Sequence, residues 1–173
     1  LTSLRGDSVT ADEFAHLPAG WNLLRTGDYR YCEYNPPLMN LLSALPVVLA
    51  GVKETGPAMP VAPEDRYGFW VNGYDFMSRF QGNYQDVFVR ARAVTVLLVG
   101  LLGLLLFSWA RWLTPARADA GGLIAAGLVW FPPTFLAHAR LVTIGAGAAC
   151  FLALAVFAFH SYLRCPDLRR ALL

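Results

Sequence analysis

Residues 93–110 read AVTVLLVGLLGLLLFSWA and contain no charged side chain. Residues 120–137 are also uncharged, and residues 141–163 contain only His160 among groups that titrate near neutral pH. An α-helix rises about 1.5 Å per residue, so about 20 apolar residues cross the ~30 Å hydrocarbon layer of a bilayer. These segments predict three transmembrane helices, over about residues 93–113, 120–137 and 141–163.

The composition also favours an all-α membrane protein. Apolar residues make up 56% of the chain, above the ~45–50% usual in soluble domains, and charged residues make up 15%, below the usual ~25%. The net charge of +2 is small, and no basic stripe is interleaved with aromatic residues, so a nucleic-acid partner is not expected. The three cysteines, Cys32, Cys150 and Cys165, lack the spacing of a metal site. The first partner that the sequence indicates is the lipid bilayer.

The links between the spans are short. Pro132 and Pro133 should kink or end the second span. The loop at residues 138–140 should then join the last two spans as a tight antiparallel hairpin. A short basic tail follows the third span and completes a membrane domain over residues 93–173.

The distribution of arginine predicts the orientation of the spans, because short cytoplasmic loops are enriched in Lys and Arg. The link between the first two spans and the C-terminal tail are both arginine-rich, whereas the hairpin loop carries only Arg140. Residues 1–92 are therefore expected on the outer face of an inner (cytoplasmic) membrane, although Arg90 and Arg92 mildly favour the opposite orientation. Ten of the twelve acidic residues lie in this region, so a site is expected there.

The outer region should begin with a short membrane-surface helix over about residues 11–25. Thr10 and Glu13 match a capping box, in which each side chain bonds to the backbone amide of the other. Pro18 lies within the helix and should bend or break it.

A second membrane-surface helix is expected over about residues 36–51, interrupted by Pro46. Its apolar stretch is shorter than the ~20 residues that a span needs, so the helix should lie on the membrane rather than cross it. Residues 53–92 read as a loop region, with a short helix near Tyr74–Phe80.

Polar side chains gather near the first of these helices. At helical spacing Asp12 and His16 share one face and Glu13 lies beside it. Helix capping alone explains the presence of Thr10 and Glu13, but it does not explain the presence of His16 as well. A second polar group follows in the linker between the two helices, at Asp28, Glu33 and Asn35.

Four stretches resemble glycosyltransferase family 39, which includes protein O-mannosyltransferases and lipid A aminoarabinose transferases. They are DEFAHLPAGWNLLRTGD, NPPLMNLLSALPVVLAG, FVRARAVTVLLVGLLGLLLFSWARWL and FLAHARLVT, in this order. The resemblance covers most of the chain but only the N-terminal part of a full-length family member. It implies a polytopic enzyme that moves a sugar from a polyprenyl phosphate to an acceptor hydroxyl or phosphate outside the cytoplasm.

By this resemblance, Asp12 is the general base or the acid that steers the acceptor, and Glu13 supports it. The candidate substrate-binding residues are His16, Asp28, Glu33 and Asn35. The leaving phosphate needs a positive group, and the Glu13-x-x-His16 spacing also allows a divalent metal, although no metal ligand is assigned.

The chain departs from the family pattern at two places. Asn35 precedes the double proline where family members commonly carry a lysine or histidine. Residues 144–147, IGAG, follow the HARLVT motif where family members commonly carry an aspartate. These departures leave an alternative, in which the chain is a catalytically inactive subunit derived from a transferase. It would pack through its Gly/Ala-rich third span and its leucine-rich first span into a larger membrane complex.

Overall fold

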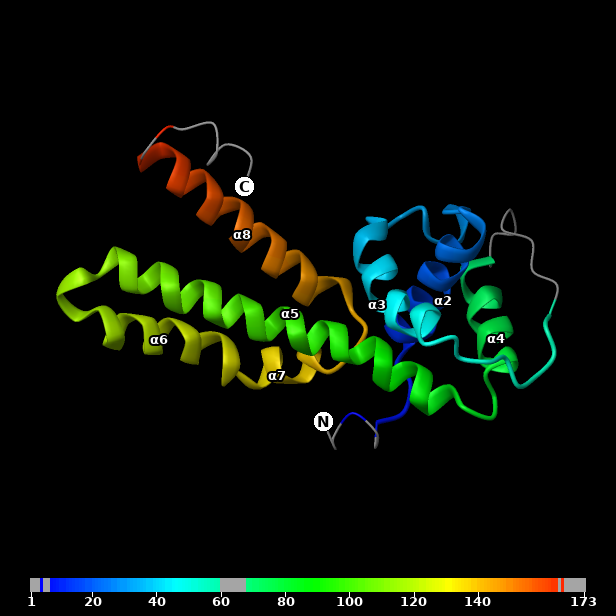
Figure 1. The fold of residues 1–173 in the computed structure, drawn as a ribbon. Helices are drawn as coiled ribbons and strands as arrows, with labels where there is room; N and C mark the ends of the chain where they lie inside the picture. Colours follow the sequence, from blue (N-terminus) through cyan, green and yellow to red (C-terminus); the bar gives the residue numbers. More distant parts are fainter. Residues whose placement is uncertain (1–3, 5–6, 60–67, 165, 167–173) are drawn as a thin grey trace. The chain divides into compact units, whose positions relative to one another are not determined.

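The computed structural model describes residues 4, 7–59, 68–164 and 166, and within these ranges every regular element is helical. The elements, drawn in Figure 1, are α2 (Ala11–Thr26), η1 (Arg30–Cys32), α3 (Pro37–Leu49), α4 (Gly68–Arg79), α5 (Tyr84–Leu113), η2 (Pro115–Arg117), α6 (Ala118–Trp130), α7 (Pro133–Ala139) and α8 (Ile144–Arg164). The chain divides into two compact units. The first unit is Leu1–Thr95 with Arg140–Ile144, and the second is Val96–Ala139 with Gly145–Leu173.

Helix α2 is the central element of the first unit, since it packs against both α3 and α4. The capping box at its start is present: Glu13 accepts from the Thr10 amide at 3.1 Å, and the Thr10 hydroxyl accepts from the Glu13 amide at 3.5 Å. The helix ends at Gly27, whose φ of 75° is the left-handed conformation that glycine adopts without strain. Both ends of α2 are therefore set by local sequence.

The core of the first unit is aromatic and aliphatic. Trp21 of α2 makes edge-to-face contacts with Phe76 and Phe80, with ring centroids 5.6 and 5.7 Å apart. The buried residues of this core are Leu17, Trp21, Ala44, Val47, Phe76, Phe80, Val87, Phe88, Ala91 and Val142. Gly20 lets α2 approach α3 closely, because a Cβ atom at this position would overlap the backbone carbonyl of Asn40.

The helical segments expected at residues 11–25 and 36–51 are present as α2 and α3, but neither is broken by its proline. Helix α2 continues through Pro18, and α3 continues through Pro46. An internal proline removes one backbone hydrogen bond and strains the preceding turn. Packing offsets this cost at Pro18, whose side chain is less than 2% exposed.

The expected loop region at residues 53–92 is more helical than its composition suggests. Helix α4 begins at Gly68, and α5 begins at Tyr84, ahead of the first uncharged segment. The first part of α5 contains charged residues such as Asp86 and Arg90, so it is not part of the apolar segment from which the helix was predicted. Residues 60–67 lie outside the described part of the chain.

Helices α5 and α8 are long and apolar enough to cross a membrane, which makes the chain a membrane-associated helical protein. The expected second span is not one straight helix, because α6 ends at Trp130 and α7 begins at Pro133, with a bend of 63°. With its 13 residues α6 rises about 20 Å, less than the ~30 Å hydrocarbon layer. The described residues therefore contain two helices that are long and apolar enough to cross a membrane, or three such segments if α6 and α7 count together.

Helices α5, α6 and α8 all contribute buried residues to the core of the second unit. Trp130 donates from its indole Nε1 to the Val99 carbonyl at 3.3 Å. A Cβ atom at Gly103 would overlap the Trp130 ring, so the glycine makes room for this indole. Further along α5, Trp109 donates to the Nδ1 atom of His160 in α8 at 3.1 Å.

Candidate functional site

A buried ion pair lies at the N-terminal end of α2. Arg92 donates from Nε to Glu13 Oε1 at 2.6 Å and from Nη2 to Glu13 Oε2 at 2.8 Å. The two side chains are 2% and 0% exposed. Two parallel hydrogen bonds fix direction as well as distance. The pair therefore fixes the first turn of α2 against α5.

Every polar atom of this ion pair has a partner. The Glu13 carboxylate also accepts from the backbone amides of Thr10 and Val142, at 3.1 and 3.0 Å. The other guanidinium N–H groups of Arg92 donate to the backbone carbonyls of Leu4, Asp7 and Ser8, at 2.7, 3.3 and 3.2 Å. An arginine has five N–H donors, and here all five are used. This complete set of partners offsets the several kcal/mol per ion that burial of charge costs.

The Glu13 carboxyl is held in its charged form. Burial alone would raise its pKa, but the hydrogen bonds from Arg92 and from the Thr10 and Val142 amides outweigh burial and lower the pKa below its ordinary value of 4.5. Because both oxygens are inside the protein and already paired, Glu13 does not offer an acceptor to a substrate. Its geometry is that of a positioning residue for its neighbour Asp12.

Asp12 has the opposite environment. It is exposed, in the first turn of α2, where the partial positive charge of the helix N-terminus favours a carboxylate. Burial lowers the pKa of His16, one turn further along, and the negative charge of Asp12 partly opposes this shift. Asp12 is thus a solvent-accessible acid on a helix end whose position Glu13 and Arg92 determine.

His16 is buried beside a thiol. Its Nδ1 atom lies 4.0 Å from Cys32 Sγ, and Asn35 donates to the same sulfur at 3.7 Å. The His16 ring also meets the edge of Phe69, with centroids 6.0 Å apart. Burial lowers the pKa of His16, and the opposing effects of Asp12 and Asn40 only partly offset it. His16 is therefore mainly neutral at pH 7 and serves as a hydrogen-bonding group rather than a cation.

The remaining candidate residues do not form one cluster with Asp12. Asp28 follows the C-terminal end of α2, on the order of 20 Å from Asp12 at 1.5 Å per helical residue, and it forms an exposed ion pair with Arg30 at 2.7 Å. Glu33 is exposed and directly follows Cys32. The structure thus brings Asn35 to the His16 end of α2, through Cys32, and leaves Asp28 at the other end.

Arg92 is the main residue that the sequence interpretation missed, since Arg92 entered it only as evidence on orientation. A signal was present: Arg92 continues the buried stripe of α5, which recurs at alternating intervals of four and three residues, at Phe88, Arg92, Thr95, Val99 and Leu102. A charged residue inside such a stripe indicates a buried partner. Nothing in the local sequence identifies that partner as Glu13.

The described part of the chain shows no group of metal-binding side chains. Among residues 7–59 and 68–164, no three His, Cys, Asp or Glu side chains come together in an arrangement that could hold a metal ion. The Glu13-x-x-His16 spacing is not available for this purpose, since the Glu13 oxygens are already paired within the protein.

Comparison with known protein families, with curated proteins and with solved structures finds no match to this chain. The class of protein is therefore defined by the structure itself: a helical membrane-associated protein. Its first unit presents an exposed acid on a rigidly held helix end.

Proposed function

We propose that this chain is a glycosyltransferase-like integral membrane protein that transfers a sugar from a polyprenyl-phosphate donor to an acceptor on the outer face of the inner membrane. The observation that carries the proposal is the contrast between Asp12 and Glu13. The second acid is fully paired inside the protein, which leaves the first exposed on a fixed helix end.

In the proposed reaction, Asp12 acts as general base. Its carboxylate removes the proton of the acceptor hydroxyl as the hydroxyl oxygen forms a bond to the anomeric carbon of the sugar. The bond from that carbon to the phosphate oxygen breaks, and polyprenyl phosphate leaves with the bonding electron pair. His16, with its pKa lowered by burial, stays neutral and contributes a hydrogen bond at the same end of α2.

The proposal divides the sequence candidates by role. Asp12 is the residue that touches substrate, and Glu13 positions it through Arg92. Glu33 and Asn35 follow η1 near the His16 end of α2, and in this scheme they contact substrate. Asp28, paired with Arg30 at the far end of α2, has no role in proton transfer in this scheme.

The test is the variant Asp12→Asn in membranes that contain the full chain. Transfer from polyprenyl-phosphate mannose and from polyprenyl-phosphate aminoarabinose should fall by at least about 100-fold, because general-base catalysis contributes ~10²–10⁴-fold. Asp86→Asn is the matched control, since Asp86 is an exposed helical acid of the same unit. Undiminished transfer by a folded Asp12→Asn protein would remove the enzyme proposal.

A second function is supported by one feature of α8. Gly145 and Ala148 are exposed and one turn apart, and a Cβ atom added at Gly145 would meet no atom within 4 Å. Small exposed residues let membrane helices pack closely. In this alternative the chain is a noncatalytic subunit that stabilises a larger membrane complex.

The mass of the purified protein in detergent distinguishes the two proposals, because it shows whether partner subunits are bound. The alternative predicts that the chain, purified in mild detergent, elutes with stoichiometric partner subunits, and that Gly145→Leu releases them. A chain that elutes alone and transfers sugar would overturn it.

A further inference from the structure

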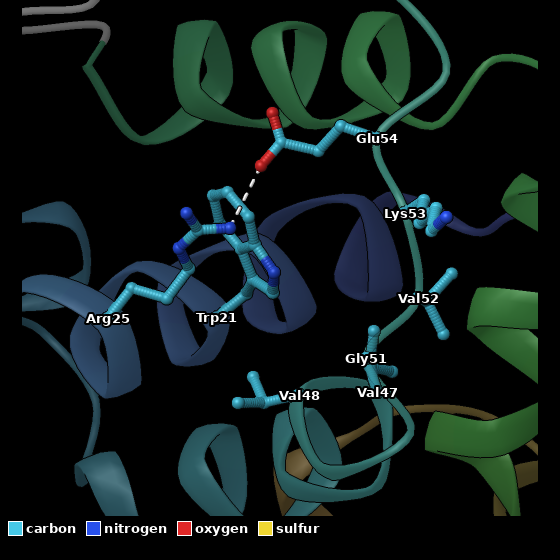
Figure 2. A pocket seen from close by; sticks show the side chains of 8 residues that line it. All are labelled: Trp21, Arg25, Val47, Val48, Gly51, Val52, Lys53 and Glu54. Atoms are coloured by element: carbon cyan, nitrogen blue, oxygen red, sulfur yellow. Dashed lines mark hydrogen bonds and ion pairs between the residues drawn. The ribbon is translucent and has the colours of Figure 1, made fainter.

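A pocket of about 550 Å³ opens in the first unit (Figure 2), and Asp12 is not among its lining residues. It lies beside the C-terminal half of α2 and the end of α3, and the segment that follows α3 closes another side. Its lining residues are Trp21, Arg25, Val47, Val48, Gly51, Val52, Lys53 and Glu54. Neither the transfer reaction nor the sequence motifs account for this pocket.

Guanidinium groups cover the aromatic ring at the base of the pocket. Figure 2 shows Arg25 over the Trp21 ring, and its guanidinium carbon lies 4.6 Å from the ring centroid. Arg79 approaches the same ring at 5.7 Å. Trp21 itself is only 6% exposed. A sugar ring therefore cannot stack on this indole, and the accessible surface above it is cationic.

Positive charge exceeds negative charge around the pocket. Glu54 accepts hydrogen bonds from both Arg25, at 2.8 Å, and Arg79, at 3.0 Å. Arg79 also pairs with Asp75 at 2.7 Å, so the excess of positive charge is one and comes from Lys53. Lys53 is exposed and forms no ion pair with any residue in the described ranges. An anion entering the pocket would thus meet Lys53 and the exposed part of Arg25.

The pocket also has apolar lining residues, close in sequence to exposed leucines of α3. Val48 and Val52 line the pocket. Val48 lies one helical turn from Leu45, which is 39% exposed. Val52 follows the end of α3, three residues after Leu49, which is 76% exposed. A ligand that fits this surface has an anionic end for the cations and a hydrocarbon part for the valines and leucines.

We propose that this pocket binds the headgroup of an anionic membrane phospholipid. Its phosphate lies between Lys53 and Arg25, and its glycerol backbone and first methylene groups lie against Val48 and Val52. The proposal rests on the membrane-surface placement expected for residues 36–51, the segment that contains α3, and on the integral membrane protein of the proposed function, but it does not depend on sugar transfer. An occupied pocket would anchor the first unit to the bilayer next to α3.

The test uses native mass spectrometry of the full chain with phosphatidylglycerol and phosphatidylcholine added in detergent. Phosphatidylglycerol should bind more tightly, and Lys53→Gln should weaken its binding about fivefold, the effect of one basic residue near an anionic lipid surface. Phosphatidylcholine binding should not change. Arg90→Gln is the matched control, because Arg90 is a similarly exposed cation of the same unit that pairs with Asp86.

Three results would overturn the proposal. The first is equal affinity for the two lipids, and the second is an equal effect of Lys53→Gln and Arg90→Gln. The third is displacement of phosphatidylglycerol by millimolar glycerol 3-phosphate, which would assign the pocket to a free phosphate compound. Asp12→Asn should retain lipid selectivity, so failure of the transferase proposal and failure of this one are distinguishable.

Discussion

Arg92 and Glu13 lie 79 positions apart in the sequence, and their side chains form hydrogen bonds of 2.6 and 2.8 Å inside the first unit. Through the Val142 amide, which donates to Glu13 at 3.0 Å, the same contact includes the segment that follows α7. Three distant parts of the chain therefore meet at the start of α2. Asp12, the exposed neighbour of Glu13, is held in place by this junction.

We expect Arg92→Met to lower the free energy of unfolding by ~3–5 kcal/mol, because it leaves the Glu13 carboxylate buried without its cation. The loss can be measured by thermal or denaturant unfolding in detergent, followed by tryptophan fluorescence. Arg90→Met provides the control: its ion pair with Asp86 is exposed, and such pairs contribute ~0–1 kcal/mol.

The double variant Glu13→Gln with Arg92→Met tests whether the two residues act together. Removal of both charges avoids the uncompensated carboxylate, so the double variant should be less destabilised than the sum of the single variants. Strictly additive losses would show that the two side chains are energetically independent, contrary to the geometry.

The ion pair also predicts a dependence of stability on pH. The pKa of Glu13 is lowered in the folded protein, so the folded state binds its proton less readily than the unfolded state does. The stabilisation is fully present above the ordinary pKa of 4.5 and is lost as the pH falls through the lower folded pKa. Unfolding curves of the wild type and Glu13→Gln should therefore converge on acidification below pH 4.5, and a constant gap between them would contradict this prediction.

The sequence predicts features that depend on neighbouring residues better than features that depend on distant ones. The capping box of Thr10 and Glu13 can be predicted from the sequence because both partners lie within one helical turn. The same glutamate also pairs with Arg92, and no local pattern reveals this contact. The role of Glu13 as a positioning residue could thus not be separated from a catalytic role before the fold was known.

Prediction of the helix ends from the sequence has the same limit. Pro18 was expected to bend or break α2, but its side chain is buried and the helix is not broken there. Pro132 and Pro133 do end a helix, as expected, because the second proline begins α7 and the first cannot donate a backbone hydrogen bond. Whether a proline is tolerated depends on what surrounds it, and that is a property of the tertiary structure.

Gly20→Ala should destabilise the first unit. The added methyl group would overlap the Asn40 carbonyl, and backbone atoms of α3 cannot move aside as a flexible side chain can. Overpacking of this kind costs ~1–3 kcal/mol, which exceeds the ~1 kcal/mol that alanine gains over glycine in helix propensity. Gly100→Ala in α5 is the control, since its Cβ atom would meet nothing within 4 Å and the variant should unfold no earlier than the wild type.

His16 gives a further prediction, for the range between pH 5 and 8. Burial lowers its pKa from the ordinary 6.5, so the folded protein favours the neutral imidazole and the unfolded chain takes up a proton first. The resulting stability is present above pH 6.5 and is lost as the pH falls towards the folded pKa, with a slope of at most ~1.4 kcal/mol per pH unit. The variant His16→Gln removes this titration.

The difference in unfolding free energy between the wild type and His16→Gln should therefore be constant above about pH 7.5, one unit past the ordinary pKa. It should shift in favour of the variant below pH 6.5. A difference that stays constant from pH 8 to pH 5 would show that His16 is as easily protonated in the folded protein as in the unfolded chain.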